Sequence, residues 1–130
     1  MPDIILLDEE TRNAQLTALV AKLDGGSGNA KLKLGTASMA VTAVVITLNK
    51  PCGTVSAGSL TISGLPKSAL STAVGHNVLV AATLTDSNDV VRVSGMSIGE
   101  TGSDSTIIIQ NANVNEGQEV IVNNPAVITL

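Results

Sequence analysis

Two hydrophobic periods divide this chain into a short first part and a long second part. In the first part, apolar residues recur at the i, i+3, i+4, i+7 spacing of one helix face: Leu16, Leu19, Val20 and Leu23. Asp8 is placed to cap the first turn, and Gly25 in the glycine-rich run 25–28 suits the left-handed conformation beyond the last turn. The pattern therefore predicts one amphipathic helix over about residues 8–23, with its apolar face buried.

From residue 30 onward the period changes to the alternation of β-strands. Val, Ile and Thr become frequent, and clusters of Gly, Asn, Asp and Ser separate the apolar runs. Leu32 and Leu34, for example, alternate with Lys31 and Lys33, as in a strand with one buried face. Eight segments carry this pattern: 30–35, 41–48, 54–63, 77–85, 89–95, 105–110, 118–122 and 126–130. Such a succession of short strands is typical of a sandwich or a barrel.

The turn signals between these segments favour antiparallel neighbours. Residues 85–89 (Thr-Asp-Ser-Asn-Asp) and 115–118 (Asn-Glu-Gly-Gln) each predict a hairpin. Pro125 cannot donate a ladder hydrogen bond, so an edge is expected there. Residues 64–70 are expected to form an irregular connection that can hold a short helical turn. We predict an all-β fold, an antiparallel β-sandwich or jelly roll of about eight strands with one N-terminal helix.

The length of the chain fits one β domain preceded by a short appendage. Its 130 residues make one domain of ordinary size. Residues 1–29 are expected to form an arm, the helix and a Gly-rich linker, and residues 30–130 to form the β-sandwich domain. No apolar run approaches the roughly 18 to 20 residues of a membrane helix, and residues 1–10 lack the basic start of a secretory signal. We therefore expect synthesis in a cytoplasm and no membrane partner.

Composition removes several classes of function. The chain has no Phe, Trp or Tyr, its seven Lys and Arg face eleven Asp and Glu, and its net charge is −4. Without aromatic rings it has no platform on which bases stack, and without a basic surface it does not attract phosphates. No nucleic-acid partner is therefore expected. The core must consist of Val, Ile, Leu, Ala and Met, which bury less surface than aromatic rings.

The residue types of catalytic and metal sites are too few to form one. His76, the only histidine, lacks a nucleophile and an acid in its motif, so we interpret it as a solvated or packing side chain. A neighbouring lysine could lower the thiol pKa of Cys52, but a small buried filler is the preferred interpretation. Asp86, Asn88 and Asp89 resemble only the start of a calcium loop, because its Gly and Glu are missing, and a hairpin explains them better. We expect no enzymatic activity, no metal and no cofactor.

Both ends of the sequence are apolar. Residues 4–7 read Ile-Ile-Leu-Leu, and residues 126–130 read Ala-Val-Ile-Thr-Leu. Either both are strands of the chain's own sheet, or one of them adds to the sheet of a neighbouring subunit. The candidate contacts with a neighbouring subunit are these ends and the helix face: Ile4, Ile5, Leu6, Leu7, Leu16, Leu19, Val20, Leu23 and Leu130. We expect the working unit to be an oligomer on a larger assembly.

The order of motifs along the chain is itself informative. A short Asp-Ile-hydrophobic segment precedes a helix with Arg-Asn at residues 11–14 (Thr-Arg-Asn-Ala), a Gly-rich break at 25–28 and a Leu-Lys-Leu strand at 31–34. The second half adds four turns and strands: 85–89, 93–95 (Val-Ser-Gly), 102–104 (Gly-Ser-Asp) and 115–118. This order resembles that of small structural proteins encoded beside capsid genes in tailed bacteriophages.

The resemblance implies a virion component, most specifically a capsid decoration (cement) protein. Such proteins bind the outer surface of the icosahedral head, bridge and stabilise major capsid protein subunits, and often oligomerise at symmetry axes. The implied partners are the major capsid protein and other copies of the chain, with a trimer slightly preferred to a dimer. The implied location is the capsid exterior of the virion, after synthesis in the host bacterial cytoplasm. A tail, fibre or spike-associated virion protein is the alternative, and an adhesin-like or pilin-like binding module is a third possibility.

Overall fold

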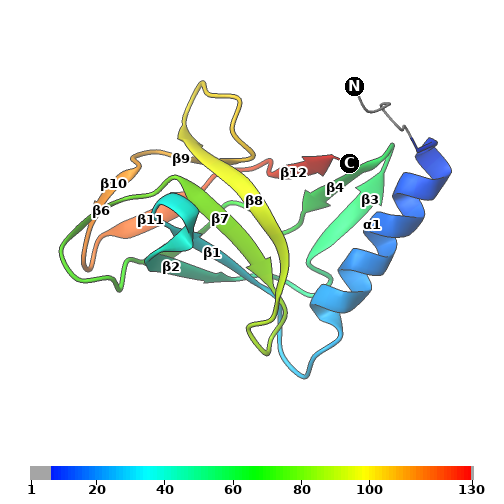
Figure 1. The fold of residues 1–130 in the computed structure, drawn as a ribbon, viewed down its shortest axis with the longest axis horizontal. Helices are drawn as coiled ribbons and strands as arrows, with labels where there is room; N and C mark the ends of the chain where they lie inside the picture. The colour runs from blue at the N-terminus through cyan, green and yellow to red at the C-terminus, as the bar shows by residue number, and fades with distance from the viewer. Residues whose placement is uncertain (1–6, 130) are drawn as a thin grey trace.

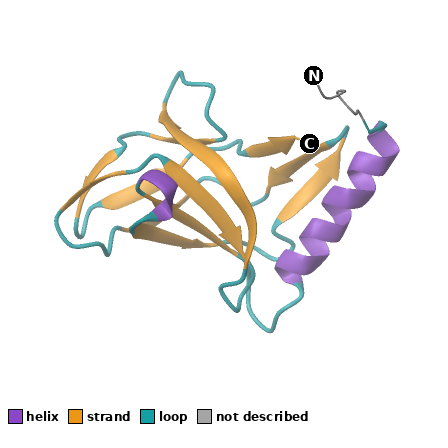
Figure 2. Ribbon diagram, in the orientation of Figure 1, coloured by secondary structure: helices purple, strands orange, loops and turns teal. Residues whose placement is uncertain are grey.

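The computed structural model describes residues 7–129, which form one α-helix, a short 3₁₀ helix and twelve strands (Figure 1 and Figure 2). The helices are α1 (Glu9–Asp24) and η1 (Ala37–Met39). The strands are β1 (Lys31–Gly35), β2 (Thr42–Thr47), β3 (Gly53–Ser56), β4 (Ser59–Ile62), β5 (Lys67–Leu70), β6 (His76–Val78), β7 (Ala81–Thr85), β8 (Val91–Glu100), β9 (Ile107–Ile109), β10 (Asn113–Asn115), β11 (Glu119–Val122) and β12 (Val127–Thr129). The all-β class with one N-terminal α-helix is confirmed, with more and shorter strands than expected.

The helix begins where the sequence predicts. Asp8 Oδ1 accepts a hydrogen bond from the backbone N–H of Thr11 at 2.8 Å, which satisfies one of the free donors of the first turn. Glu9 and Glu10 follow in that turn, where the positive end of the helix dipole favours carboxylates. The capping residue and the first turn are therefore readable from the sequence.

The far end of the helix differs from the expectation. Gly25 was expected to be left-handed, and this is wrong, because its φ is −75° and its N–H donates to the Lys22 carbonyl at 3.5 Å. Tertiary hydrogen bonds hold the segment after the helix instead. Lys50 Nζ, for example, donates to the Gly26 carbonyl at 3.1 Å. A long-range contact of this kind has no signature in the local sequence.

The strands form one large curled sheet and two small ones. The large sheet has seven strands in the order β2-β1-β7-β8-β9-β11-β5. Its neighbours pair antiparallel except for β8 and β9, which run parallel. Its two edge strands meet, because the Thr72 N–H donates to the Ala43 carbonyl at 2.8 Å. Lys67 Nζ also donates to the Thr47 carbonyl, at 3.0 Å. The large sheet is therefore a nearly closed barrel with a seam between β2 and β5.

The small sheets lie at two sides of the barrel. The three-stranded sheet has the order β12-β4-β3, and α1 packs along β3 and β4 (Figure 1). The two-stranded sheet consists of β10 and β6. As Pro125 predicts, the strand that follows it, β12, lies at an edge of its sheet.

Asn13 of the helix bonds to the turn between β3 and β4, and the Arg12 side chain lies beside that turn. Asn13 Oδ1 accepts a hydrogen bond from the Gly58 N–H at 2.8 Å. Ala57 and Gly58 have φ of 52° and 77°, the two positive values of a tight hairpin turn. A Cβ on residue 58 would lie 2.8 Å from Arg12 Nη1, the end of a flexible side chain that can move, so it is the positive φ that favours glycine here. Asn13 of the Arg-Asn pair thus has a structural role, which is to hold α1 to this turn.

Several strand expectations are corrected by the fold. The predicted strand 54–63 is the hairpin β3–β4, and the predicted strand 77–85 is divided between β6 and β7. The division arises because β6 pairs with β10 instead of continuing in the barrel. The irregular connection expected over 64–70 is wrong, because Lys67–Leu70 is β5 and pairs with β11. The Ser and Ala inside β5 are poor strand signals, and pairing with β11 overrides that propensity.

The second predicted hairpin is only partly correct. The turn at residues 115–118 forms, because the Gln118 N–H donates to the Asn115 carbonyl at 3.0 Å and Gly117 has φ 83°. The strands on its two sides do not pair with each other, however, because β10 pairs with β6 and β11 pairs with β5 and β9. The turn therefore connects two different sheets.

The core of the barrel is aliphatic. Leu32 of β1, Leu84 of β7 and Ile107 of β9 are at most 1% exposed. Leu23 of α1 belongs to the same cluster. In the absence of aromatic rings, many Leu, Ile and Val side chains share the burial that stabilises the fold.

Candidate interaction surface

The outer face of the barrel carries a small apolar patch beside the seam. Val45 on β2, Leu70 on β5 and Ile121 on β11 are 40%, 57% and 38% exposed. We call these three residues the outer patch. Exposed aliphatic side chains that gather on adjacent strands, rather than singly, mark a candidate contact surface.

The strand register places the outer patch on one face. In the β5–β11 pair, Ile121 lies opposite Ser68, and Leu70 lies opposite Glu119. Val120 lies between Glu119 and Ile121 in the sequence and is buried, so strand alternation directs the side chains of Glu119 and Ile121 outward. The outer patch thus continues from β5 onto β11, with the polar residues Ser68 and Glu119 beside it.

The seam brings Val45 next to this face. The hydrogen bond between Thr72 and Ala43 joins β2 to the end of β5. The two strands run antiparallel there. Leu70, two residues before Thr72, is therefore a neighbour of Val45, two residues after Ala43. Val44 is fully buried, so the alternation of β2 turns Val45 outward. The outer patch therefore depends on the closure of the barrel.

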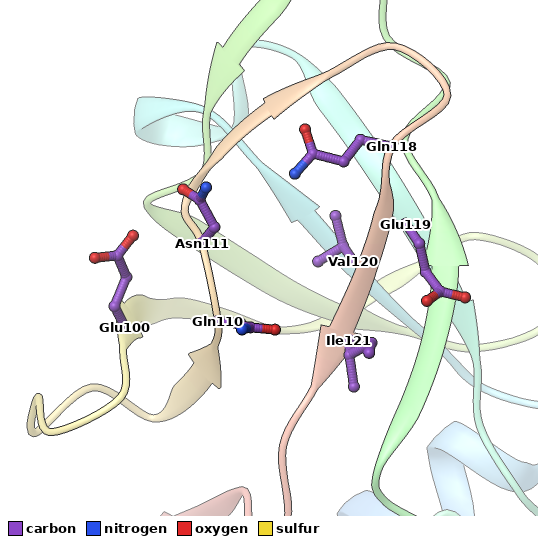
Figure 3. Close-up of a pocket in the computed structure, with 7 residues that line it drawn as sticks. All are labelled: Glu100, Gln110, Asn111, Gln118, Glu119, Val120 and Ile121. Atoms are coloured by element: carbon purple, nitrogen blue, oxygen red, sulfur yellow. The ribbon is translucent and has the colours of Figure 1, made fainter.

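A polar groove borders the outer patch at β11. It has a volume of about 530 Å³. Figure 3 shows Glu100, Gln110 and Asn111 on one side of it and the β11 residues on the other. The complete lining is Glu100, Gln110, Asn111, Gln118, Glu119, Val120 and Ile121. Ile121 thus belongs to both surfaces, which makes the patch and the groove continuous.

The groove lies in the acidic part of the chain. All seven Lys and Arg residues occur at or before Arg92, where seven acidic residues balance them. The remaining carboxylates are Glu100, Asp104, Glu116 and Glu119. The whole net charge of −4 therefore belongs to residues 93–130, and two of its four carriers line the groove.

The helix face predicted as a contact lies against the chain's own core. Leu16 and Leu23 are 1% and 0% exposed, and Leu19 and Val20 are half-buried against the same core. Leu16 and Leu23 therefore have no surface to offer a neighbour in this fold.

The apolar ends contribute one described residue to the predicted contacts. Leu7 is 41% exposed just before α1. The other predicted contact residues at the ends lie outside the described residues: Ile4, Ile5, Leu6 and Leu130. The contact proposed for residues 4–7 therefore rests on the sequence pattern and on the exposure of Leu7.

His76 and Cys52 lie apart in different surroundings. His76 is exposed on β6, and its Nδ1 lies 3.3 Å from Asn115 Oδ1. Cys52 is 2% exposed, and its backbone N–H donates to Asp24 Oδ2 at 3.2 Å. Burial first, and then the nearby Asp24 carboxylate, raise the pKa of the Cys52 thiol to about 12. The thiol is thus protonated at neutral pH and packs as a small apolar group.

We expect Cys52 to resist thiol reagents in the folded protein. Because its pKa is about 12, the reactive thiolate is scarce at pH 8, and labelling should be more than about 100-fold slower than in the urea-unfolded chain. The release of thionitrobenzoate from Ellman's reagent measures both rates. Stoichiometric labelling of the folded chain at the unfolded rate would show that the thiol is accessible.

The segment that resembled a calcium loop is a hairpin turn organised by Asp86. Asp86 Oδ1 accepts the N–H groups of Asn88 at 2.9 Å and Val90 at 3.1 Å. Its Oδ2 accepts from Arg92 Nη2 at 3.1 Å, so both carboxylate oxygens serve the hairpin. Asp89 has φ 64°, a conformation that Asp tolerates in turns. The hairpin interpretation of residues 85–89 is confirmed.

Asp86 gives the fold an acid-sensitive element. The hydrogen bond from the Val90 N–H, and after it Arg92 and the Asn88 N–H, lower the pKa of Asp86 below its usual 3.8, although burial opposes them. A lowered folded pKa stabilises the protein above the unfolded pKa and stops doing so as pH falls through the folded value.

We therefore expect Asp86→Asn to unfold at lower urea concentration than the parent at pH 7. The difference should shrink as the pH falls below about 4, since the parent then loses the charged form. Asp104→Asn, in the exposed loop after β8, is the matched control and should follow the parent at every pH. An Asp86→Asn variant as stable as the parent at pH 7 would contradict this role.

Neither a metal centre nor a relative identifies this surface. Among residues 7–129, no three His, Cys, Asp or Glu side chains form a group that could hold a metal ion. No helix in the described part of the chain has both the length and the apolar character to cross a membrane. Comparisons with protein-family models, curated proteins and solved structures gave no match.

Sequence reasoning missed the outer patch. Val45 belongs to a nearly continuous apolar run, 41–48, in which no alternation distinguishes the outward residue. Leu70 lies in the segment that was expected to be irregular. Ile121 lies in a strand that was predicted, but its neighbours Val120 and Val122 are also apolar, so the sequence does not distinguish it as the outward residue.

Proposed function

We propose that this chain is a bacteriophage capsid decoration (cement) protein. In this role it binds the outer surface of the icosahedral head and bridges and stabilises major capsid protein subunits. Its partners are the major capsid protein and other copies of itself, with a trimer slightly preferred to a dimer. The motif order of the sequence supports the class, and the outer patch is the structural observation that carries the proposal.

The outer patch suits a protein that is held by many repeated contacts. Val45, Leu70 and Ile121 offer a small apolar area, which is weak as a single contact. Copies placed around a symmetry axis repeat the contact, and simultaneous engagement makes retention strong without a large interface. This combination suits a decoration protein, because its partner is a shell whose subunits repeat around symmetry axes.

A tail, fibre or spike-associated virion protein is the alternative. The same all-β body and apolar patch would serve such a subunit equally well. The two functions differ in stoichiometry, because a decoration protein covers a whole shell, whereas a tail or spike component is present in few copies. The number of copies per virion therefore distinguishes them.

The proposal is tested by charges on the outer patch. The test variant carries both Val45→Glu and Leu70→Glu. Because both side chains are exposed in the parent, the double variant is expected to keep its fold. Its binding to capsids of the phage should weaken by about tenfold or more, since carboxylates would be buried at an apolar contact. Co-sedimentation with capsids measures the affinity, and circular dichroism checks the fold.

A matched control lies outside the patch. Val74→Glu alters a side chain that is 86% exposed, and it should bind capsids like the parent. Parental binding by the folded double variant would show that the outer patch is not the contact.

A further inference from the structure

The barrel sheet is open along part of β11. This strand pairs with β5 from Glu119 to Val122, but it pairs with β9 only at Val122, opposite Ile109. After Ile109 the chain turns away towards β10, and the Ala112 N–H donates to Glu100 Oε2 at 3.0 Å. The groove of about 530 Å³ occupies the place where the next strand would continue.

The backbone of β11 faces this opening. The Gln118 carbonyl accepts the Ser71 N–H on the β5 side, at 2.8 Å. Since the backbone groups of a strand alternate between its two edges, those of Glu119 and Ile121 point into the groove. The Asn123 N–H fits this alternation, because it donates to the Ile108 carbonyl on the β9 side at 2.9 Å. Within residues 7–129, no strand pairs with Glu119 or Ile121 on that side.

Such an edge accepts an extended segment. Open strand edges bind peptides by continuing the ladder, with main-chain hydrogen bonds giving affinity and flanking side chains giving selectivity. Five of the seven lining side chains are polar, and two of these, Glu100 and Glu119, are carboxylates. Figure 3 shows the Gln118 side chain extending into the opening from just before β11, and its Oε1 accepts the Asn115 N–H at 3.1 Å.

The charge distribution selects the kind of segment. Residues 93–130 have no Lys or Arg, so no cation of that part of the chain neutralises the groove. Residues 1–11 of a second copy would be repelled, because they carry four carboxylates and no Lys or Arg. Charge complementarity therefore favours a different protein that presents Lys or Arg on an extended segment.

We infer that the groove beside β11 binds a short, extended, Lys- or Arg-bearing segment of a partner protein by strand addition to Glu119–Val122. This inference rests on the proposed function in one respect, namely that the partner is the major capsid protein. Ile121 joins the groove to the outer patch, so the same capsid subunit contacts both surfaces. The groove orients the partner segment and selects for its positive charge, and the outer patch adds apolar contact.

A peptide titration of the full chain tests the binding mode. The probe is the acetylated and amidated peptide Val-Lys-Val-Thr-Lys-Val, and its control carries Glu in place of both Lys. Amide shifts in ¹H–¹⁵N spectra should change at residues 110–112 and 118–121 and not at the 85–89 hairpin. The effect should weaken with added salt and be absent with the Glu peptide. Shifts elsewhere only, equal shifts with both peptides, or no shifts would overturn the inference.

Charge variants separate this inference from the proposed function. Glu100→Gln with Glu119→Gln keeps the length of each side chain and one acceptor oxygen in each but removes both charges, and it should weaken peptide and capsid binding by about tenfold. Glu116→Gln, on the exposed turn before β11 and outside the lining of the groove, should behave like the parent. If the parent binds capsids and the double variant binds them equally well, the groove is wrong and the proposed function stands. If the peptide maps to the groove but the parent binds no capsid, strand addition stands and the capsid as partner is wrong.

Discussion

Deletion of residues 1–7 is expected to release the protein from capsids while leaving the β domain folded. The segment contains Ile4, Ile5, Leu6 and Leu7, and burying each such side chain contributes roughly 1.5–3 kcal/mol. An arm that lodges on a neighbouring subunit would therefore supply several kcal/mol, enough for a loss of more than about 100-fold in affinity. Quantitative co-sedimentation of parent and truncated protein with capsids measures this loss.

The truncation leaves the rest of the fold available for a control measurement. Asp8, which caps α1 through the Thr11 N–H, is retained. The truncated chain should therefore unfold at nearly the same urea midpoint as the parent, with any small difference due to the loss of Leu7. If it still saturates capsids at parental affinity, residues 4–7 belong to the chain's own fold, and the contact must lie on the outer patch and the groove alone.

The substitution Leu23→Ala is expected to lower the free energy of unfolding by about 2–5 kcal/mol. Leu23 is fully buried and packs in the same core as the barrel strands. Removing its three outer carbons creates a cavity that surrounding aliphatic side chains fill only in part. Urea denaturation followed by far-ultraviolet circular dichroism measures the change.

Val74→Ala is the control for this loss. Val74 is 86% exposed, so its truncation should change the free energy of unfolding by less than about 0.5 kcal/mol. Equal small effects at both positions would mean that α1 contributes little to the stability of the barrel. A separate early transition in the Leu23→Ala variant would mean that the helix unfolds independently of the strands.

The helix and most strands could be predicted because each has a local cause. Asp8 and the stripe of Leu16 and Leu23 define where α1 begins and which face it buries. The alternation of Leu32 and Leu34 with two lysines likewise identifies β1 and its buried face. These signals depend only on neighbours in the sequence, so they survive without knowledge of the fold.

The remaining features depend on contacts between distant residues. The strand β5 forms because β11 and the seam with β2 pair with it, although its own sequence is a weak strand signal. The outer patch exists only once that seam places Leu70 beside Val45. The groove exists only because the chain turns away from β11 after Ile109, the last residue of β9. No period or motif in the sequence encodes such long-range contacts. They create the part of the candidate site that could not be predicted from the sequence.

The copy number and position of the protein on purified virions test the proposed function most directly. Electron cryo-microscopy of virions, with quantitative mass spectrometry of the same preparation, gives both quantities. If the chain is a decoration protein, we expect hundreds of copies per particle, on the order of a repeating shell lattice, as density on the outer surface of the head that bridges major capsid protein subunits. A few copies confined to the tail, a fibre or a spike, or no copies at all, would contradict the proposed function.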